Sequence, residues 1–196
     1  MYDNTSLRIL EQVYTKPGIH KRELSKQLKL GMPSIEYALR KIGSLVKKKK
    51  SGNQINYYLD YSKELLTPLL YNIEYIRLQR LPSKAKIAIR DFMKDLPEKP
   101  ILSVLFGSYA KGDYTPSSDI DILLVFQKIS NNKKIEDTAK KISLRTGIEL
   151  NPVYLEYNPF KESFHNTTKQ FFKNLKEEKI LLAGIEWWRQ LKNEET

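Results

Sequence analysis

The stretch GSYAKGDYTPSSDIDILLV (residues 107–125) decides how this 196-residue chain is interpreted. It follows a short apolar run, ILSVLF (101–106), and it leads into a second one, IDILLVF (120–126). This pattern predicts two buried strands joined by a turn of helix and a loop. Asp121 lies inside the second strand and Asp119 lies directly before it. Because alternate strand residues point to the same side, we expect both carboxylates on one face, with Cα atoms ~7 Å apart.

Two carboxylates at this separation repel each other unless a cation or hydrogen bonds compensate. Mg²⁺ prefers oxygen ligands, so Asp119 and Asp121 are candidate metal ligands and candidate catalytic residues. Glycine lets backbone approach a ligand closely, and a serine at a helix start offers a hydroxyl and free amides. Gly107 and Ser108 are therefore expected to bind phosphate. Lys111 either attracts the same phosphate or is a solvated surface charge.

The sequence has Gly107-Ser108, then ten residues, then Asp119-x-Asp121. This arrangement resembles the signature of the DNA polymerase beta-like nucleotidyltransferase superfamily. It most resembles the minimal nucleotidyltransferases of bacteria and archaea, in which GSxARGxxxxxSDIDLLV is a common form. The resemblance covers roughly residues 83–185. It implies a small domain with a mixed sheet flanked by helices. The expected elements are helices over 84–96, 133–145 and about 161–180, and a third strand over 147–155.

The same resemblance implies transfer of a nucleoside monophosphate from a nucleoside triphosphate to an acceptor hydroxyl. Gly107 and Ser108 would hold the triphosphate, and Asp119 and Asp121 would bind Mg²⁺. Active members carry a third carboxylate on the third strand, and the aligned position here is Asn151. Glu149 lies two residues earlier with the same parity, so it is either the substitute catalytic carboxylate or an ordinary exposed strand residue.

Residues 1–60 contain 12 Lys and Arg against 5 Asp and Glu, a net charge of +7 out of +11 for the chain. Their pattern predicts helices over 6–14, 21–28 and 33–45, then strands over 45–50 and 54–59 around a Ser51-Gly52-Asn53 turn. The first helix is expected to bury Leu7, Leu10 and Val13, and the hairpin to bury Leu45, Ile55, Tyr57 and Leu59.

This order of elements resembles a winged helix-turn-helix domain. The resemblance implies a recognition helix in the major groove of double-stranded DNA and a basic hairpin on the phosphates. The implied DNA-binding residues are Ser34, Tyr37, Arg40, Lys41, Lys47, Lys48, Lys49 and Lys50. The alternatives are that the lysines protect an exposed strand edge, or that the domain binds protein.

We therefore expect an α+β protein with a winged helix-turn-helix over 1–62, a connecting helix over 63–82 and a nucleotidyltransferase-like domain over 83–196. The connecting segment is expected to turn Leu69, Leu70, Ile73 and Ile76 inward. The chain has no cysteine, which argues against disulfides and thiolate metal sites. Its two histidines, His20 and His165, are far apart and argue against a structural zinc site. The absence of cysteine also favours a cytoplasmic protein. No apolar stretch approaches the ~20 residues of a membrane span, so no membrane contact is expected.

Two functions remain open from the sequence. The first is a DNA-binding enzyme that uses Mg²⁺ and a nucleoside triphosphate and modifies an acceptor, for example a partner toxin. The second is a transcriptional regulator whose nucleotidyltransferase domain senses nucleotide or binds a partner with little turnover. A homodimer is compatible with either, because winged helices commonly bind symmetric DNA sites.

Overall fold

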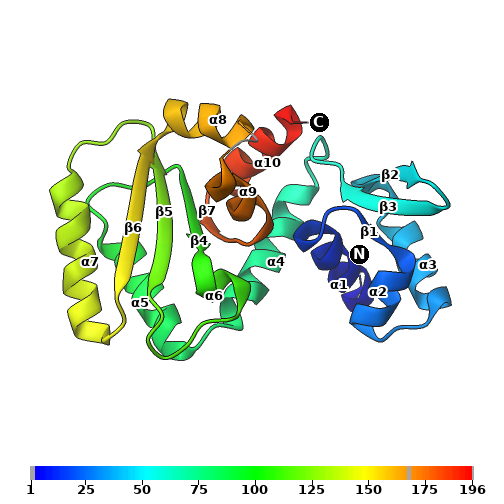
Figure 1. Cartoon of the computed structure of the whole chain (residues 1–196), viewed down its shortest axis with the longest axis horizontal. Helices are drawn as coiled ribbons and strands as arrows, with labels where there is room; N and C mark the ends of the chain where they lie inside the picture. Colours follow the sequence, from blue (N-terminus) through cyan, green and yellow to red (C-terminus); the bar gives the residue numbers. More distant parts are fainter. Residues whose placement is uncertain (1–2, 167–168, 196) are drawn as a thin grey trace. The chain divides into compact units, whose positions relative to one another are not determined.

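The computed structural model describes residues 3–166 and 169–195 as an α+β protein (Figure 1). The chain divides into two compact units, the first formed by residues up to Ile73 with the short segment Lys192–Glu194, and the second running from Glu74 to Leu191. Within the described residues, no helix is long and apolar enough to cross a bilayer.

The first unit combines three α-helices with a small antiparallel sheet of order β1-β3-β2. Its elements are α1 (Asn4–Thr15), β1 (Ile19–His20), α2 (Lys21–Leu28), α3 (Met32–Lys41), the 3-10 turn η1 (Gly43–Leu45), β2 (Val46–Ser51) and β3 (Gln54–Leu59). The helix expected over 33–45 ends at Lys41, because the chain tightens into the 3-10 turn from Gly43. The two-residue strand β1 was not expected from the sequence.

The core of the first unit corrects two expectations about buried residues. Helix α1 buries Ile9, Leu10, Val13 and Tyr14, whereas Leu7 is only half-buried. In the hairpin, Tyr57 and Leu59 are buried but Ile55 is 45% exposed. Ile55 pairs with Lys50 next to the turn, so it lies near the tip of the hairpin rather than at its packed base.

Helix α4 (Leu66–Gln79) begins in the first unit and ends in the second. Leu66, Leu70 and Ile73 are buried along it. Ile76 was expected to face inward, but it is 40% exposed. Glu74, two residues earlier, is buried. Glu74 forms an ion pair with Arg77 at 2.9 Å, which compensates the cost of burying its charge.

The second unit is built on a four-stranded sheet of order β6-β5-β4-β7. Its elements are α5 (Ser83–Asp95), β4 (Leu102–Phe106), α6 (Gly107–Lys111), β5 (Ile120–Phe126), α7 (Asn132–Thr146), β6 (Leu150–Glu156), α8 (Tyr157–His165), α9 (Gln170–Glu177), β7 (Ile180–Ala183) and α10 (Ile185–Glu194). Strand β4 is antiparallel to β5 and β7, while β5 and β6 are parallel. The sheet is therefore mixed, with β6 and β7 at its edges (Figure 1).

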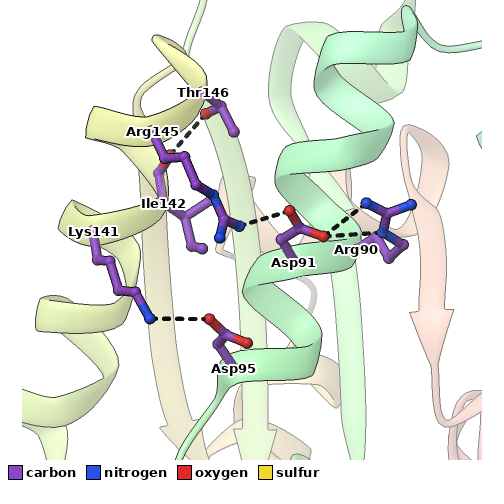
Figure 2. Close-up of polar contacts among 7 residues, drawn as sticks. All are labelled: Arg90, Asp91, Asp95, Lys141, Ile142, Arg145 and Thr146. Carbon is purple, nitrogen blue, oxygen red and sulfur yellow. Dashed lines mark hydrogen bonds and ion pairs between the residues drawn. The ribbon is translucent and has the colours of Figure 1, made fainter.

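Alternation along β5 divides the packing of the second unit between the two faces of the sheet. Ile120, Ile122, Leu124 and Phe126 join one core cluster with apolar residues of α5 and α7. Ion pairs also join these two helices, Arg145 to Asp91 at 2.6 Å and Lys141 to Asp95 at 3.3 Å (Figure 2). Asp121 has the opposite parity, so it projects from the other face of β5.

The end of the chain differs most from the sequence-based expectation. One closing helix was expected over about 161–180, but the structure has α8 and α9 there, followed by strand β7. Ile180 and Leu181, at the end of this segment, pair with Leu105 and Val104 of β4. Strand β6 begins at Leu150 rather than at 147, which leaves Glu149 in the preceding loop.

Candidate nucleotide and metal site

The two aspartates of the 107–125 stretch meet the side chain of Asn151 across the parallel strand pair. Asp121 on β5 is in register with Asn151 on β6. The Asn151 amide Nδ2 donates a hydrogen bond to Asp119 Oδ2 at 3.2 Å. The amide of Asn151 therefore bonds one of the two carboxylates, at the position where a third carboxylate was expected.

The ionised form of the Asp121 carboxyl is disfavoured by its surroundings. Burial raises its pKa above the usual value, and the negative charge of Asp119 acts in the same direction. The Asn151 hydrogen bond opposes both effects only in part, because the net shift of the pKa remains upward. A site with this balance favours a positive charge beside the pair.

Gly107 brings the end of β4 against the Asp121 carboxylate. Phe106, the last residue of β4, pairs with Asp121 in the antiparallel register. Gly107 has φ +70°, and a Cβ built on it would lie 2.2 Å from Asp121 Oδ2. No side chain larger than hydrogen fits in that position while the carboxylate stays in place. Ser108 follows in α6 and is half-buried.

The residues present fit a divalent cation. Asp119 and Asp121 supply oxygen donors, which hard cations prefer, and the Asn151 side chain has a carbonyl oxygen that can face a cation if the amide rotates. The described residues contain no group of three or more Asp, Glu, His or Cys side chains placed to hold a metal. Among the described residues, the carboxylates available to such a cation are therefore those of Asp119 and Asp121.

The other two candidates of this site, Lys111 and Glu149, are described by the contacts that they make. Lys111 Nζ forms an ion pair with Glu178 Oε2 at 2.8 Å, and this contact raises the pKa of Lys111. Glu149 is exposed, and its backbone carbonyl accepts a hydrogen bond from Ile120 N at 2.8 Å. Its side chain is not grouped with Asp119 and Asp121 in a metal-binding cluster among the described residues.

Two features near the site were missed by sequence reasoning. Glu178 lies in a charged run, KEEK (176–179), in which no residue stands out before the fold brings it to Lys111. The rings of Tyr109 and Tyr114 stack with centroids 4.7 Å apart. Burial raises the pKa of Tyr109, with smaller contributions from Tyr114 and Asp119, so this pair lies near the acidic residues. The signal for this ring pair in the sequence was two tyrosines five residues apart with a glycine between them.

The residues expected to bind DNA belong to the first unit. Ser34, Tyr37, Arg40 and Lys41 are exposed on α3. Lys41 forms an ion pair with Asp3 at 2.7 Å, and Glu36 on the same helix is paired with Lys21 at 2.7 Å.

The lysine run on β2 is divided between the two faces of the hairpin. Lys47 pairs with Asp60 at 3.3 Å, and Lys49 lies over the ring of Tyr58 at 5.3 Å. Lys48 and Lys50 point to the opposite face, with Tyr57 and Ile55 as their register partners. Lys48 also lines a small hollow with Arg40, Lys21 and Glu36, which places it beside α3.

Comparisons with known proteins agree with this description of the second unit. The family described as "Nucleotidyltransferase domain" matches residues 86–182. The Methanocaldococcus jannaschii protein MJ0141, named as a candidate protein adenylyltransferase, is 36% identical over 72 residues, covering 33% of this chain and 73% of that protein. MJ0604 of the same organism, similarly named, is 44% identical over 50 residues, covering 26% of this chain and 48% of that protein.

The solved structures that resemble this chain share less sequence identity with it than these two relatives do. A crystal structure of a toxin–antitoxin with AMP-PNP has a TM-score of 0.41 and 20% identity, covering 57% of this chain and 82% of that one. A nucleotidyltransferase from Sulfolobus solfataricus has a TM-score of 0.29 and 23% identity, covering 55% of this chain and 84% of that one.

Nucleotidyltransferases typically use a divalent metal, which agrees with the pair of carboxylates beside Gly107. The assignment itself rests on the 36% identity that spans most of MJ0141 and on the family match over the second unit. The chain belongs to the nucleotidyltransferase domain family.

Proposed function

We propose that this chain is a protein adenylyltransferase that uses Mg²⁺ and carries a DNA-binding winged helix in its first unit. The observation that carries the enzymatic part is the convergence of Asp119, Asp121 and Asn151 beside Gly107. The choice of an adenylyl group and of a protein acceptor is supported by the names of the two M. jannaschii relatives.

In this proposal the second unit transfers AMP from ATP to a hydroxyl of the acceptor, and pyrophosphate leaves. Asp119 and Asp121 hold the metal, and Asn151 keeps Asp119 oriented through its amide. When bound, the metal lowers the charge on the triphosphate and stabilises the attacking and leaving oxygens. Gly107 allows close approach of the phosphates, and the Ser108 hydroxyl donates to them. An amide takes no proton at neutral pH, so the acceptor proton leaves to solvent rather than to Asn151.

The test uses ATP labelled at the α-phosphate, with transfer to protein and release of pyrophosphate as readouts. Asp119→Asn and Asp121→Asn should each reduce transfer by at least about a hundredfold, as expected for removal of a charge that acts on the transition state. Asp113→Asn is the matched control, because Asp113 is an exposed aspartate of the same loop. Transfer that survives both active-site substitutions would reject this site. Binding of Mg-ATP without transfer would instead favour a nucleotide-sensing regulator.

The DNA-binding part rests on the exposed basic residues of α3 and on the face of β2 that carries Lys48 and Lys50. Arg40 and Lys48 line the same hollow, so both cations are available to one phosphate backbone. Ser34, Tyr37 and Lys41 would contact the groove and its edges. Lys47 and Lys49, on the other face and already in contact with Asp60 and Tyr58, would contribute less.

Gel retardation of double-stranded DNA at several salt concentrations tests this part. The variant with Lys48→Ala and Lys50→Ala should lower the slope of log affinity against log salt by about 1.8, which is about 0.9 for each phosphate that is no longer neutralised. The variant with Lys47→Ala and Lys49→Ala is the control of equal charge, and it should change the slope less. Equal slopes for both variants would show that this face of the hairpin has no special role.

A further inference from the structure

The sheet face that carries Asp121 also carries an aromatic ring beside it. Phe106 and Asp121 are direct partners in the antiparallel register of β4 and β5. Side chains of residues paired in this way lie on the same face, with Cβ atoms about 4.5–5.5 Å apart. Leu105 and Ile122, the next pair, belong to the core cluster on the other face. The half-buried Phe106 ring therefore lies next to the Asp121 carboxylate, on the face away from that core.

A second ring, that of Phe171 on α9, continues this aromatic surface. Its centroid is 5.3 Å from that of Phe106, and the two ring planes are nearly perpendicular, at 89°. All seven phenylalanines of the chain lie among the described residues, and Phe171, at 38%, is the one that is exposed. A single exposed apolar side chain is ordinary in a protein surface. Phe171 is distinguished by its contact with the ring that borders Asp121.

Helix α9 is held in place by contacts along its length. Phe172 and Leu175 are its buried residues, and the Phe172 ring also lies against Phe171, with centroids 5.1 Å apart. Glu178, directly after the helix, forms the 2.8 Å ion pair with Lys111 at the end of α6. The segment thus contacts the end of β4 through Phe171 and the end of α6 through Glu178. The exposed ring is thereby fixed next to the strand end at which α6 begins.

The two sides of Asp121 along the sheet differ in chemistry. On β6, the residues with the parity of Asn151 include Val153, which is aliphatic. On the side of β4, the side chains are the rings of Phe106 and Phe171. Aromatic side chains bind nucleobases by stacking, because every base has a π face. Phosphates gain nothing from such rings, so the aromatic side suits the base of a nucleotide rather than its phosphates.

We infer that Phe171 binds the adenine base of the nucleotide whose phosphates lie at Gly107 and Asp121. Phe106 supports the Phe171 ring from the sheet. The inference rests on the proposed adenylyltransferase function, and it adds the residue that holds the nucleoside. Phe171 then contributes affinity for the base and none for the triphosphate, a difference that binding experiments measure directly.

Isothermal titration of the full-length protein with Mg²⁺ and α,β-methylene-ATP provides the test, since the α–β bridge of this analogue cannot be cleaved by adenylyl transfer. Phe171→Ala should weaken binding of the analogue about tenfold, within the range for loss of one stacked base contact. Binding of Mg-tripolyphosphate, which has three linked phosphates and no base, should stay as in wild type.

Three further variants separate stacking from other effects. Phe171→Trp keeps an aromatic ring and should retain affinity for the analogue, whereas Phe171→Leu keeps apolar volume without a ring and should weaken it nearly as much as alanine. Tyr75→Ala removes a 63% exposed ring from α4 and should change neither affinity. Unchanged analogue binding in both Phe171→Ala and Phe171→Leu would overturn the inference. An equal loss of tripolyphosphate affinity would overturn it too, because the phosphate site itself would then have changed.

Failure of the base contact can be told apart from failure of the proposed function. Weaker analogue binding by Phe171→Ala, combined with no transfer of AMP by the wild type, would reject the adenylyltransferase activity and keep the base contact. Transfer that depends on Asp119 and Asp121, combined with unchanged analogue binding by Phe171→Ala, would reject the base contact and keep the activity. Absence of analogue binding by the wild type would reject both.

Discussion

At the scale of single residues, Gly107 links the backbone conformation at the end of β4 to the position of the Asp121 carboxylate. Its φ of +70° suits glycine, and the space of a Cβ is taken by Asp121 Oδ2. Gly112, five residues later, also has a positive φ, +88°, but nothing lies within 4 Å of a Cβ built there. Both glycines therefore have a positive φ. Gly107, unlike Gly112, also has a carboxylate in the space that a Cβ would fill.

Alanine at these two positions should therefore separate backbone strain from displacement of Asp121. Gly112→Ala should lower the free energy of unfolding by about 1 kcal/mol, the usual cost of a left-handed conformation for a residue with a Cβ. Gly107→Ala should lower it by more, because its Cβ also displaces the Asp121 carboxylate. Only Gly107→Ala should also weaken Mg-ATP binding, because the carboxylate must move. Urea unfolding and isothermal titration with Mg-ATP are the measurements. Equal reductions of nucleotide affinity in both variants would contradict the role given to Gly107.

Asp3 gives a prediction about the dependence of stability on pH. Its carboxylate accepts from Lys41 Nζ at 2.7 Å and from Ser6 N at 2.8 Å, and these bonds, the Lys41 bond first, lower its pKa from 3.8 to about 2. The folded pKa lies below the unfolded one, so the stabilisation is present at neutral pH and is lost as pH falls from about 4 to about 2.

Asp3→Asn should accordingly lower the melting temperature at pH 7, and the difference from wild type should shrink as the pH approaches 2. Asparagine is also a good N-cap, so this substitution removes the charge while keeping the acceptor for Ser6 N. Thermal unfolding followed by circular dichroism over this pH range is the measurement. A difference that stays constant down to pH 2 would mean that the ionised carboxylate does not contribute.

At the scale of elements, two ion pairs join α5 to α7 (Figure 2). Asp91 is the better candidate for a measurable effect, because it contacts both Arg145, at 2.6 Å, and Arg90, at 2.9 Å, and its side chain is 20% exposed. Asp91→Asn should lower the free energy of unfolding by about 1 kcal/mol, and less at high salt.

Asp95→Asn is the comparison for Asp91→Asn, since Lys141 is 67% exposed and the contact is longer, at 3.3 Å. It should cost less than half as much, as for ordinary surface pairs of about 0–1 kcal/mol. Urea unfolding at low and high salt measures both variants. An effect of Asp91→Asn that is independent of salt would point to packing rather than charge.

The elements that the sequence predicted well are those with a strong local signal. Strand β5 has the bounds expected from its apolar run, and the family signature placed the Gly107 corner and α7 correctly to within a few residues. Strand β7 has only four residues, and it is a strand because β4 offers it a pairing edge. That edge is more than 70 residues earlier in the chain, so local periodicity did not reveal the strand.

The same distinction between local and distant signals holds for the candidate site. The spacing of Asp119 and Asp121 and the position of Asn151 were readable from the sequence, and the structure brings these three together. The partner of Lys111 was not readable, because Glu178 reaches it only through the fold of α9. The exposure of Ile55 likewise depended on how far the hairpin extends beyond its packed base.

At the scale of the whole molecule, charge is distributed unevenly between the two units. Residues 1–60 carry +7, and residues 61–196, with 22 Lys and Arg against 18 Asp and Glu, carry +4 over more than twice the length. The proposed polyanion-binding residues belong to the first unit, and the proposed metal ligands belong to the second. DNA binding and adenylyl transfer are therefore assigned to different sets of residues.

The two proposed activities should be abolished separately in the full-length protein. The variant with Lys48→Ala and Lys50→Ala should lose DNA affinity, most clearly at low salt, and retain adenylyl transfer to its protein acceptor. The variant with Asp119→Asn and Asp121→Asn should lose transfer and retain DNA binding. Gel retardation and transfer of labelled AMP, measured on the same preparations, provide the comparison. If the lysine variant lost transfer as well, the acceptor would have to be held by the basic surface, and a nucleic acid would replace protein as the substrate.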